Sequence, residues 1–132
     1  MKTISVPISP GELIDKITIL EIKLAKITDE KKRSNVRHEL EALTATWSGA
    51  MADEDAPDIS DARERLKEVN EALWCIEDDI RECEADKAFG DRFIELARAV
   101  YFTNDKRAAI KRDINERLGS MLMEEKSYQS YS

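Results

Sequence analysis

The sequence predicts an all-α fold, in which a long antiparallel helical hairpin packs with one or two helices from the N-terminal part of the chain. Charged residues make up 37% of the 132 residues, whereas there are only four glycines and three prolines. This balance favours helices over a turn-rich β fold. Apolar residues also recur at alternating spacings of three and four, which is the period of one helix face. A chain of 132 residues is expected to form a single domain with a core of its own, spanning 1–132.

The first residues predict an extended segment followed by a strong helix start. Residues 1–8 form an extended lead-in, because polar and apolar residues alternate there and Pro7 excludes a central strand. Ser9-Pro10-Gly11-Glu12 is typical of a capping box. Ser9 is expected to cap the helix, with Pro10 at the first helical position and the Glu12 side chain reaching back to the cap amide.

The segment 9–48 permits two interpretations. An apolar stripe runs from Leu13 to Ile27, and a second stripe begins at Val36, nine residues later and on the opposite side of a continuous helix. Either the helix breaks near Thr28-Asp29, where one of these residues caps a second helix, or a single helix is bent. Ser48-Gly49 is expected to end this part, and residues 49–58 are expected to form a loop.

Two later segments predict the hairpin. The first has a heptad pattern, which is typical of coiled-coil-like packing, at Ile59, Ala62, Leu66, Val69, Leu73, Ile76, Ile80 and Cys83. Gly90 is the expected turn, with Asp91 as a candidate cap, and a second stripe runs from Phe93 to Leu118. Gly119 is expected to end that helix. The tail, 120–132, either docks on the bundle or stays mobile.

The second stripe is interrupted where Thr103 and Arg107 occupy positions that should be apolar. Binding sites in helical bundles are built at such breaks. One hypothesis is an anion site in which Arg107 and Lys111 hold a carboxylate or phosphate, while Thr103 and Asn104 supply hydrogen bonds. The alternative is structural, with Arg107 paired to acidic groups of the preceding helix or stacked on Trp74.

An acidic run between the two stripes allows a metal hypothesis. Asp78, Asp79 and Glu82 have the spacing at which carboxylates of a helical-bundle hydrolase hold Mg²⁺. The facing pair would be Glu12 and Asp15. The ordinary interpretation is a solvated acidic helix face, which the sequence favours. No cofactor is expected outside the metal hypothesis.

The charge distribution argues against nucleic acid as a partner. The net charge is −7, and residues 49–90 carry 14 acidic and 5 basic side chains, a balance of −9. Phosphate backbones are bound by basic surfaces. No apolar run approaches the ~20 residues that span a bilayer, and the first residues lack the apolar stretch of a signal peptide. We therefore expect a cytoplasmic protein without a membrane segment.

Several motifs resemble an uncharacterised bacterial all-helical domain family of about this length. They include Val6-Pro7-Ile8-Ser9-Pro10-Gly11-Glu12-Leu13-Ile14-Asp15-Lys16-Ile17-Thr18-Ile19-Leu20, and Ala97-Arg98-x-Val100-Tyr101 with Asn104-Asp105-Lys106-Arg107. The resemblance implies a small helical protein and no established activity. The first helix is also faintly similar to helical chorismate mutases, and the acidic run to all-α nucleotide pyrophosphohydrolases. The basic residues of the former and the second carboxylate pair of the latter have no convincing counterparts here.

The expected function is a non-catalytic interaction or assembly module that self-associates or binds a protein partner and carries a small anion-binding patch. The competing expectation is an all-α enzyme acting on a phosphorylated or carboxylated metabolite. That enzyme would use Arg107 and Lys111 for the anion and, in its metal form, Mg²⁺.

Overall fold

The described residues form four helices: α1 (Pro10–Lys26), α2 (Glu30–Ala50), α3 (Ser60–Ala85) and α4 (Asp91–Arg117). These are the regular elements of a computed structural model that describes residues 3–53 and 55–131. Residues 1, 2, 54 and 132, which belong to the predicted lead-in, loop and tail, lie outside the described part. The all-α prediction is confirmed, and of the two interpretations of residues 9–48, two separate helices is correct.

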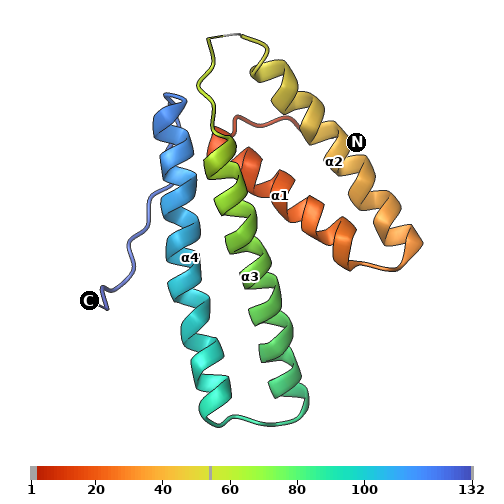
Figure 1. Ribbon diagram of the computed structural model, residues 1–132, viewed down its shortest axis with the longest axis vertical. Coiled ribbons are helices and arrows are strands. Elements are labelled where there is room, and N and C mark those ends of the chain that lie inside the picture. The colour runs from red at the N-terminus through yellow and green to blue at the C-terminus, as the bar shows by residue number, and fades with distance from the viewer. Residues whose placement is uncertain (1–2, 54, 132) are drawn as a thin grey trace.

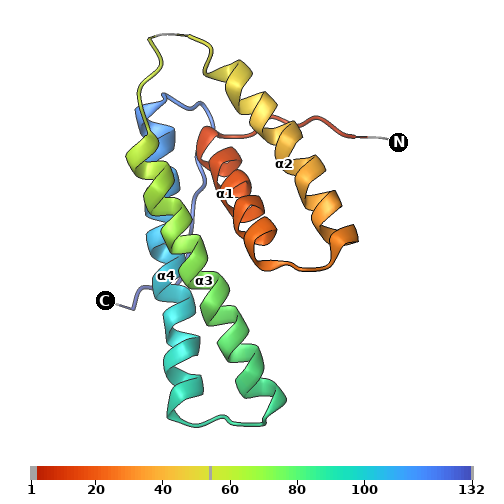
Figure 2. The ribbon, with the colours of Figure 1, turned by 45° about the vertical axis from the view of Figure 1, so that its right-hand side comes forward.

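Two antiparallel hairpins make up the architecture (Figure 1). Helices α3 and α4 run side by side along their whole lengths, and α1 packs against both of them near the end where α3 begins. Helix α2 returns along α1, and in the part of the chain that the structure describes its backbone comes close to that of no other helix (Figure 2). The half of the α3–α4 hairpin that contains its turn therefore projects beyond α1 and α2.

Local capping explains where the helices start and stop. The Ser9 hydroxyl accepts a hydrogen bond from the Glu12 amide at 3.2 Å, and the Asp29 carboxylate accepts one from the Lys32 amide at 3.0 Å. Each satisfies an amide that has no partner within its helix. Gly119 follows α4 with φ of 64°, the left-handed conformation that ends helices. The Glu12 side chain, which was expected to reach back to the cap, instead accepts a hydrogen bond from Lys111.

Three predicted boundaries were wrong. Helix α2 continues through Ser48 and Gly49 to Ala50, so the loop begins at residue 51. A glycine ends a helix when it turns left-handed, and Gly49 does not adopt positive φ. Helix α3 begins at Ser60, so Ile59 is its cap residue and the last residue of the loop between α2 and α3. Gly90, without a side chain, is the cap residue of α4, and Asp91 lies in the first turn, where its charge favours the helix dipole.

The core lies where α1 crosses the hairpin. Its fully or nearly fully buried members come from α1, α4, the start of α3 and the residue before it: Leu13, Ile14, Ile17, Ile59, Ala62, Leu66, Ile110 and Ile114. Beyond α1, the heptad residues Leu73, Ile76 and Ile80 are only half-buried. None of the helices in the described residues is long and apolar enough to cross a membrane.

The C-terminal tail, residues 121–131, has no helix or strand and folds back along α4 (Figures 1 and 2). Ion pairs join Glu124 to Lys111, Glu125 to Arg112 and Lys126 to Asp105. Of the two predicted states of this segment, the structure has the docked one.

Candidate functional site

A polar cluster lies in the middle of the molecule, at the edge of the core. At its centre the Asp15 side chain of α1 is 1% exposed. Arg107 of α4 donates to both of its carboxylate oxygens, with Nε 2.9 Å from Oδ1 and Nη2 bound to Oδ2. Asn70 of α3 donates to Asp15 Oδ1 and to Thr18 Oγ1, both at 3.0 Å. One carboxylate of α1 thus binds the two helices of the hairpin at once.

Lys111 lies one turn beyond Arg107 and extends this cluster. Its side chain is only 7% exposed, and its Nζ lies 2.6 Å from Glu12 Oε2 and 2.9 Å from Glu124 Oε2. Asp15 Oδ2 is 4.0 Å away. The ammonium group is therefore held by a carboxylate of α1 and by one of the C-terminal tail.

The cluster continues for one more turn of α4. The amide of Gly11 donates to Asn115 Oδ1 at 2.7 Å, so α1 and α4 are joined by a backbone-to-side-chain bond in the interior. A Cβ on Gly11 would lie 2.5 Å from the Lys111 carbonyl oxygen. Glycine is required here because the backbone of α4 leaves no space for a side chain.

The electrostatics of the cluster favour its charged forms. Burial alone would raise the pKa of Asp15, but hydrogen bonds from Arg107 and Asn70, with the charges of Arg107 and Lys111, hold this pKa below its usual value. Burial likewise works against the charge of Lys111, yet bonds to Glu12 and Glu124 raise its pKa. In the described residues, no buried side-chain nitrogen or oxygen lacks a hydrogen-bond partner.

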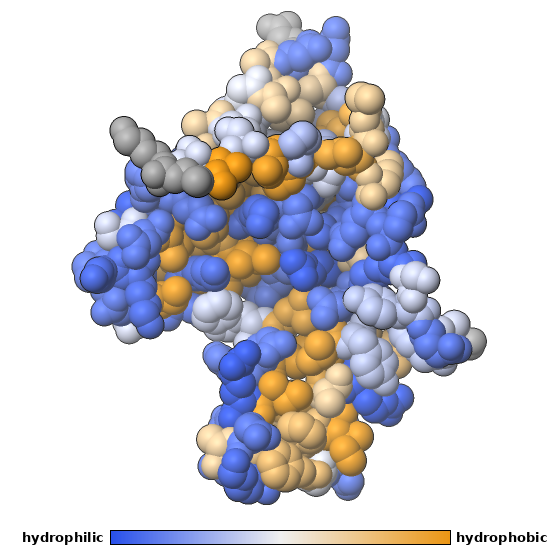
Figure 3. Space-filling view, turned by 180° about the vertical axis from the view of Figure 1, so that it is seen from behind, coloured by the Kyte–Doolittle hydropathy of each residue, from blue (hydrophilic) through white to orange (hydrophobic). Residues whose placement is uncertain are grey.

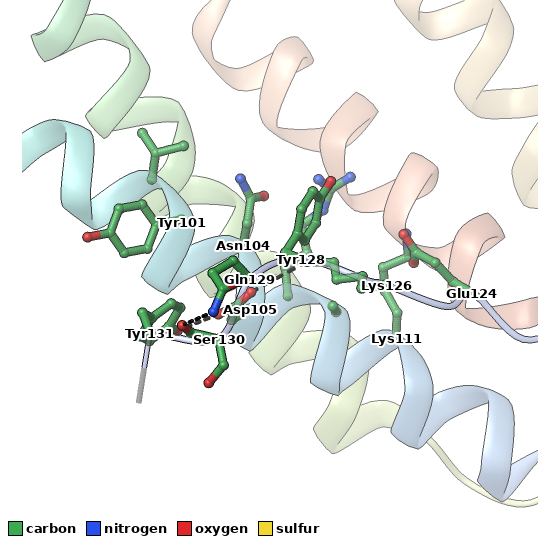
Figure 4. Close-up of a pocket in the computed structure, with 13 residues that line it drawn as sticks. Tyr101, Asn104, Asp105, Lys111, Glu124, Lys126, Tyr128, Gln129, Ser130 and Tyr131 are labelled. Carbon is green, nitrogen blue, oxygen red and sulfur yellow. Dashed lines mark hydrogen bonds and ion pairs between the residues drawn. The ribbon is translucent and has the colours of Figure 1, made fainter.

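Two pockets flank Arg107. The larger, about 1170 Å³, lies between α4 and the C-terminal tail, and Lys111, Asn104 and three tyrosines line it (Figure 4). The smaller, about 510 Å³, lies between α1, α3 and α4. Asn104 and Arg107 line both pockets.

The structure thus brings three of the four predicted anion-site residues to one pocket: Asn104, Arg107 and Lys111. Thr103 is half-buried and lines neither pocket. Arg107 has an internal acidic partner, as the structural alternative expected, but this partner belongs to α1 and not to the preceding helix.

The predicted metal ligands point to different sides of α3. Asp78 lines the smaller pocket, whereas Asp79 lies 3.9 Å from Arg92 and faces α4. The proposed facing pair, Glu12 and Asp15, is engaged with Lys111 and Arg107. In the part of the chain that the structure describes, no group of three or more His, Cys, Asp or Glu side chains is arranged to hold a metal ion. The Mg²⁺ hypothesis for Asp78, Asp79 and Glu82 therefore stays a prediction without geometric support.

Four residues of the cluster were missed from the sequence: Thr18, Asn70, Asn115 and Glu124. Only Thr18 carried a local signal, because it lies four residues from both Ile14 and Ile22, on a second apolar stripe of α1. Asn70 and Asn115 are single polar residues beside apolar stripes, and sequence spacing does not tell a buried asparagine from an exposed one.

Comparison with protein families gives a match over residues 4–131, to a family described as being of unknown function. This confirms the predicted resemblance to an uncharacterised domain family. Neither the curated proteins nor the solved structures give a match.

Proposed function

This chain belongs to the family of unknown function DUF6165, and we propose that it is a non-catalytic assembly module that pairs with a second copy of itself. The pairing surface is the distal half of the hairpin, defined as residues 71–106 of α3, α4 and the turn between them. We place the module in the cytoplasm, where the exposed thiol of Cys75 would stay reduced.

The observation that carries this proposal is an apolar stripe on the α3–α4 hairpin, which extends beyond the part of the hairpin that α1 covers. Helix α1 covers the hairpin closely near Leu66 and Ile110, whereas beyond Asn70 and Arg107 a pocket separates it from α3, and in the described residues neither α1 nor α2 reaches the turn of the hairpin. Figure 3 shows hydrophobic residues following one another down the projecting part. Its half-buried apolar members are Leu73, Trp74, Ile76, Ile80, Phe93, Leu96 and Val100.

Further large apolar side chains flank this stripe and are exposed. Ile94 is 53% exposed and Tyr101 is 42% exposed. Large contiguous apolar patches are rare on monomers and mark interaction surfaces. Burial is worth about 25 cal/mol for each Å² of apolar surface removed from water, so covering this face would stabilise the chain.

A second copy fits this face for two reasons. The heptad spacing of α3 is the pattern with which helices pack on other helices, and beyond α1 the packing of α4 buries Cys83 but leaves Leu73, Ile76 and Ile80 half-buried. The flanking charges are also complementary between the two helices. Residues 77–86 of α3 carry six acidic and one basic side chain, a balance of −5, whereas residues 91–107 of α4 carry three acidic and four basic ones, a balance of +1. A two-fold pair in which α3 of one copy crosses α4 of the other brings opposite charges together.

The test is the mass of the full chain in solution, measured by sedimentation equilibrium over a range of concentrations. We expect twice the 15.1 kDa of one chain. Ile94→Lys adds a charge to the surface without touching the core, and it should raise the dissociation constant by about 30-fold or more, since burying an isoleucine is worth about 2 kcal/mol.

Val6→Lys is the matched control, because Val6 is also aliphatic and exposed but lies in the lead-in, outside the distal half. This variant should associate like the wild type. A monomer at all concentrations, or equal association of the wild type and Ile94→Lys, would refute the proposed pairing.

A further inference from the structure

The larger pocket holds a lysine whose ammonium group is paired with the C-terminal tail as well as with α1. The ammonium group of Lys111 donates to Glu12 and lies 2.9 Å from the tail residue Glu124, while Asp15 Oδ2, 4.0 Å away, is too far for a hydrogen bond. If the tail moved away, a nearly buried ammonium would lose one of its two close carboxylate partners. An unpartnered buried donor is costly, so the position attracts another carboxylate.

The ion pair between Glu124 of the tail and Lys111 can open without unfolding the helices. Glu124 is 46% exposed although its partner Lys111 is 7% exposed. All residues 121–131 are exposed, and ion pairs, the hydrogen bond from Tyr131 to Asp105 and the ring contacts of Tyr131 hold the tail, without a buried apolar core. The other ion pairs of the tail, Glu125 with Arg112 and Lys126 with Asp105, lie between partly exposed side chains and are weak. An external anion that reaches Lys111 can therefore compete with Glu124.

Three tyrosine side chains line the pocket next to Lys111. Tyr128 lies between Lys111 and Tyr101 along the pocket, and Tyr131 lies beside Tyr101 (Figure 4). The rings of Tyr101 and Tyr131 are 5.4 Å apart, while Tyr128 is largely exposed. Aromatic faces pack on flat rings, and Asn104 offers a polar group on the same wall.

We infer that this pocket binds a small carboxylic acid that carries a ring, with its carboxylate on Lys111 in place of Glu124 and its ring against Tyr128. Charge favours a monoanion. The carboxylate of a monoanion replaces the single negative charge that Glu124 supplies to Lys111, so the net charge around the ammonium group stays the same, whereas a dianion adds a negative charge. The tail is thereby an internal competitor of the ligand.

The experiment is an NMR titration of the ¹⁵N-labelled full chain with benzoate. Benzoate should shift the amide signals of Lys111 and of residues 124–128. Glu124→Gln removes the competing charge and should bind benzoate about two- to fivefold more tightly than the wild type, which corresponds to the worth of one partly exposed ion pair. Benzamide, which has the ring without the charge, should produce no such shifts.

Glu125→Gln is the matched control, because Glu125 is the adjacent tail carboxylate but pairs with Arg112. It should bind benzoate as the wild type does. Both substitutions change exposed side chains, so both variants should fold. Equal affinities in all three proteins, the same shifts with benzamide, or no binding of benzoate by Glu124→Gln would each overturn the inference.

Discussion

Gly11 makes the contact between α1 and α4 possible, because a side chain there would meet the backbone of α4. The Cβ in Gly11→Ala would lie 2.5 Å from the Lys111 carbonyl oxygen and 2.9 Å from Asn115 Oδ1. We expect Gly11→Ala to lower the free energy of unfolding by about 1–3 kcal/mol, the cost of overpacking an interior. Urea denaturation measures this change.

Gly49→Ala is the control for that substitution. Gly49 lies inside α2, and an added Cβ meets nothing within 4 Å. Alanine should there stabilise the chain by about 0.5–1 kcal/mol, because glycine is the weaker helix former. If Gly11→Ala were as stable as the wild type, the backbones of α1 and α4 could move apart to admit the methyl group at no cost, which would contradict the prediction.

Asp15 should make the stability of the fold depend on acid pH. Its folded pKa is below its unfolded value near 3.8, so the stability that it contributes is fully present above that value. This contribution is lost as pH falls from about 5 through the folded pKa. Asp15→Asn should unfold about 3 kcal/mol more easily at pH 7, since it removes one partner of a buried pair.

The measurement is urea denaturation at several pH values from 7 down to 2. The wild type should lose more stability over this range than Asp15→Asn does, because the variant has no proton to bind at this position. Asp55→Asn, which changes an exposed loop residue, should follow the wild-type curve. Parallel curves for the wild type and Asp15→Asn would rule out this role of Asp15.

Sequence spacing could identify Arg107 as exceptional but could not identify its partner. The polar break at Thr103 and Arg107 is visible along one helix. Asp15 is 92 positions away from Arg107, and nothing in the local pattern of α1 shows which of its faces meets α4. The two alternatives for Arg107, an anion site and a structural pair, differ only in that long-range contact.

Among the elements, α2 should be the least stable. In the described residues its backbone comes close only to that of α1, and Val36 is its one buried residue. Helices with few buried apolar contacts open locally at low free energy. Hydrogen exchange should therefore give amides of residues 38–46 at least about tenfold less protection than those of residues 108–115, after correction for intrinsic rates. Equal protection would mean that α2 opens only together with the core.

Most element boundaries could be predicted because their causes are local. Ser9, Asp29 and Gly119 act on amides or carbonyls within a few residues. The end of α2 could not be predicted, since Gly49 is compatible with both a helix and a turn, and the structure has it helical. The start of α4 could not be predicted to the residue either, because Gly90 is compatible with both a turn and a helix cap, and it caps α4 without a side-chain hydrogen bond.

For the molecule as a whole, the helical hairpin followed from heptad spacing and one glycine turn. The placement of α1 across only half of it did not. Periodicity shows which face of α3 is apolar over its full length, but it does not show how far a covering helix extends. Leu73 and Ile80 have the same heptad spacing as Leu66, yet only Leu66 is fully buried.

The pair formed by Asp15 and Arg107 has a consequence for the order in which the protein is made. A ribosome completes α1 early, but the guanidinium that neutralises Asp15 is added 92 residues later. Until then the nascent chain carries the carboxylate of Asp15 without its main counterion, and α1 lacks the partner that holds it against α4. A polypeptide that stops before residue 107 also lacks Ile110 and Ile114 of the core, so α1 reaches its native packing only after α4 has been synthesised.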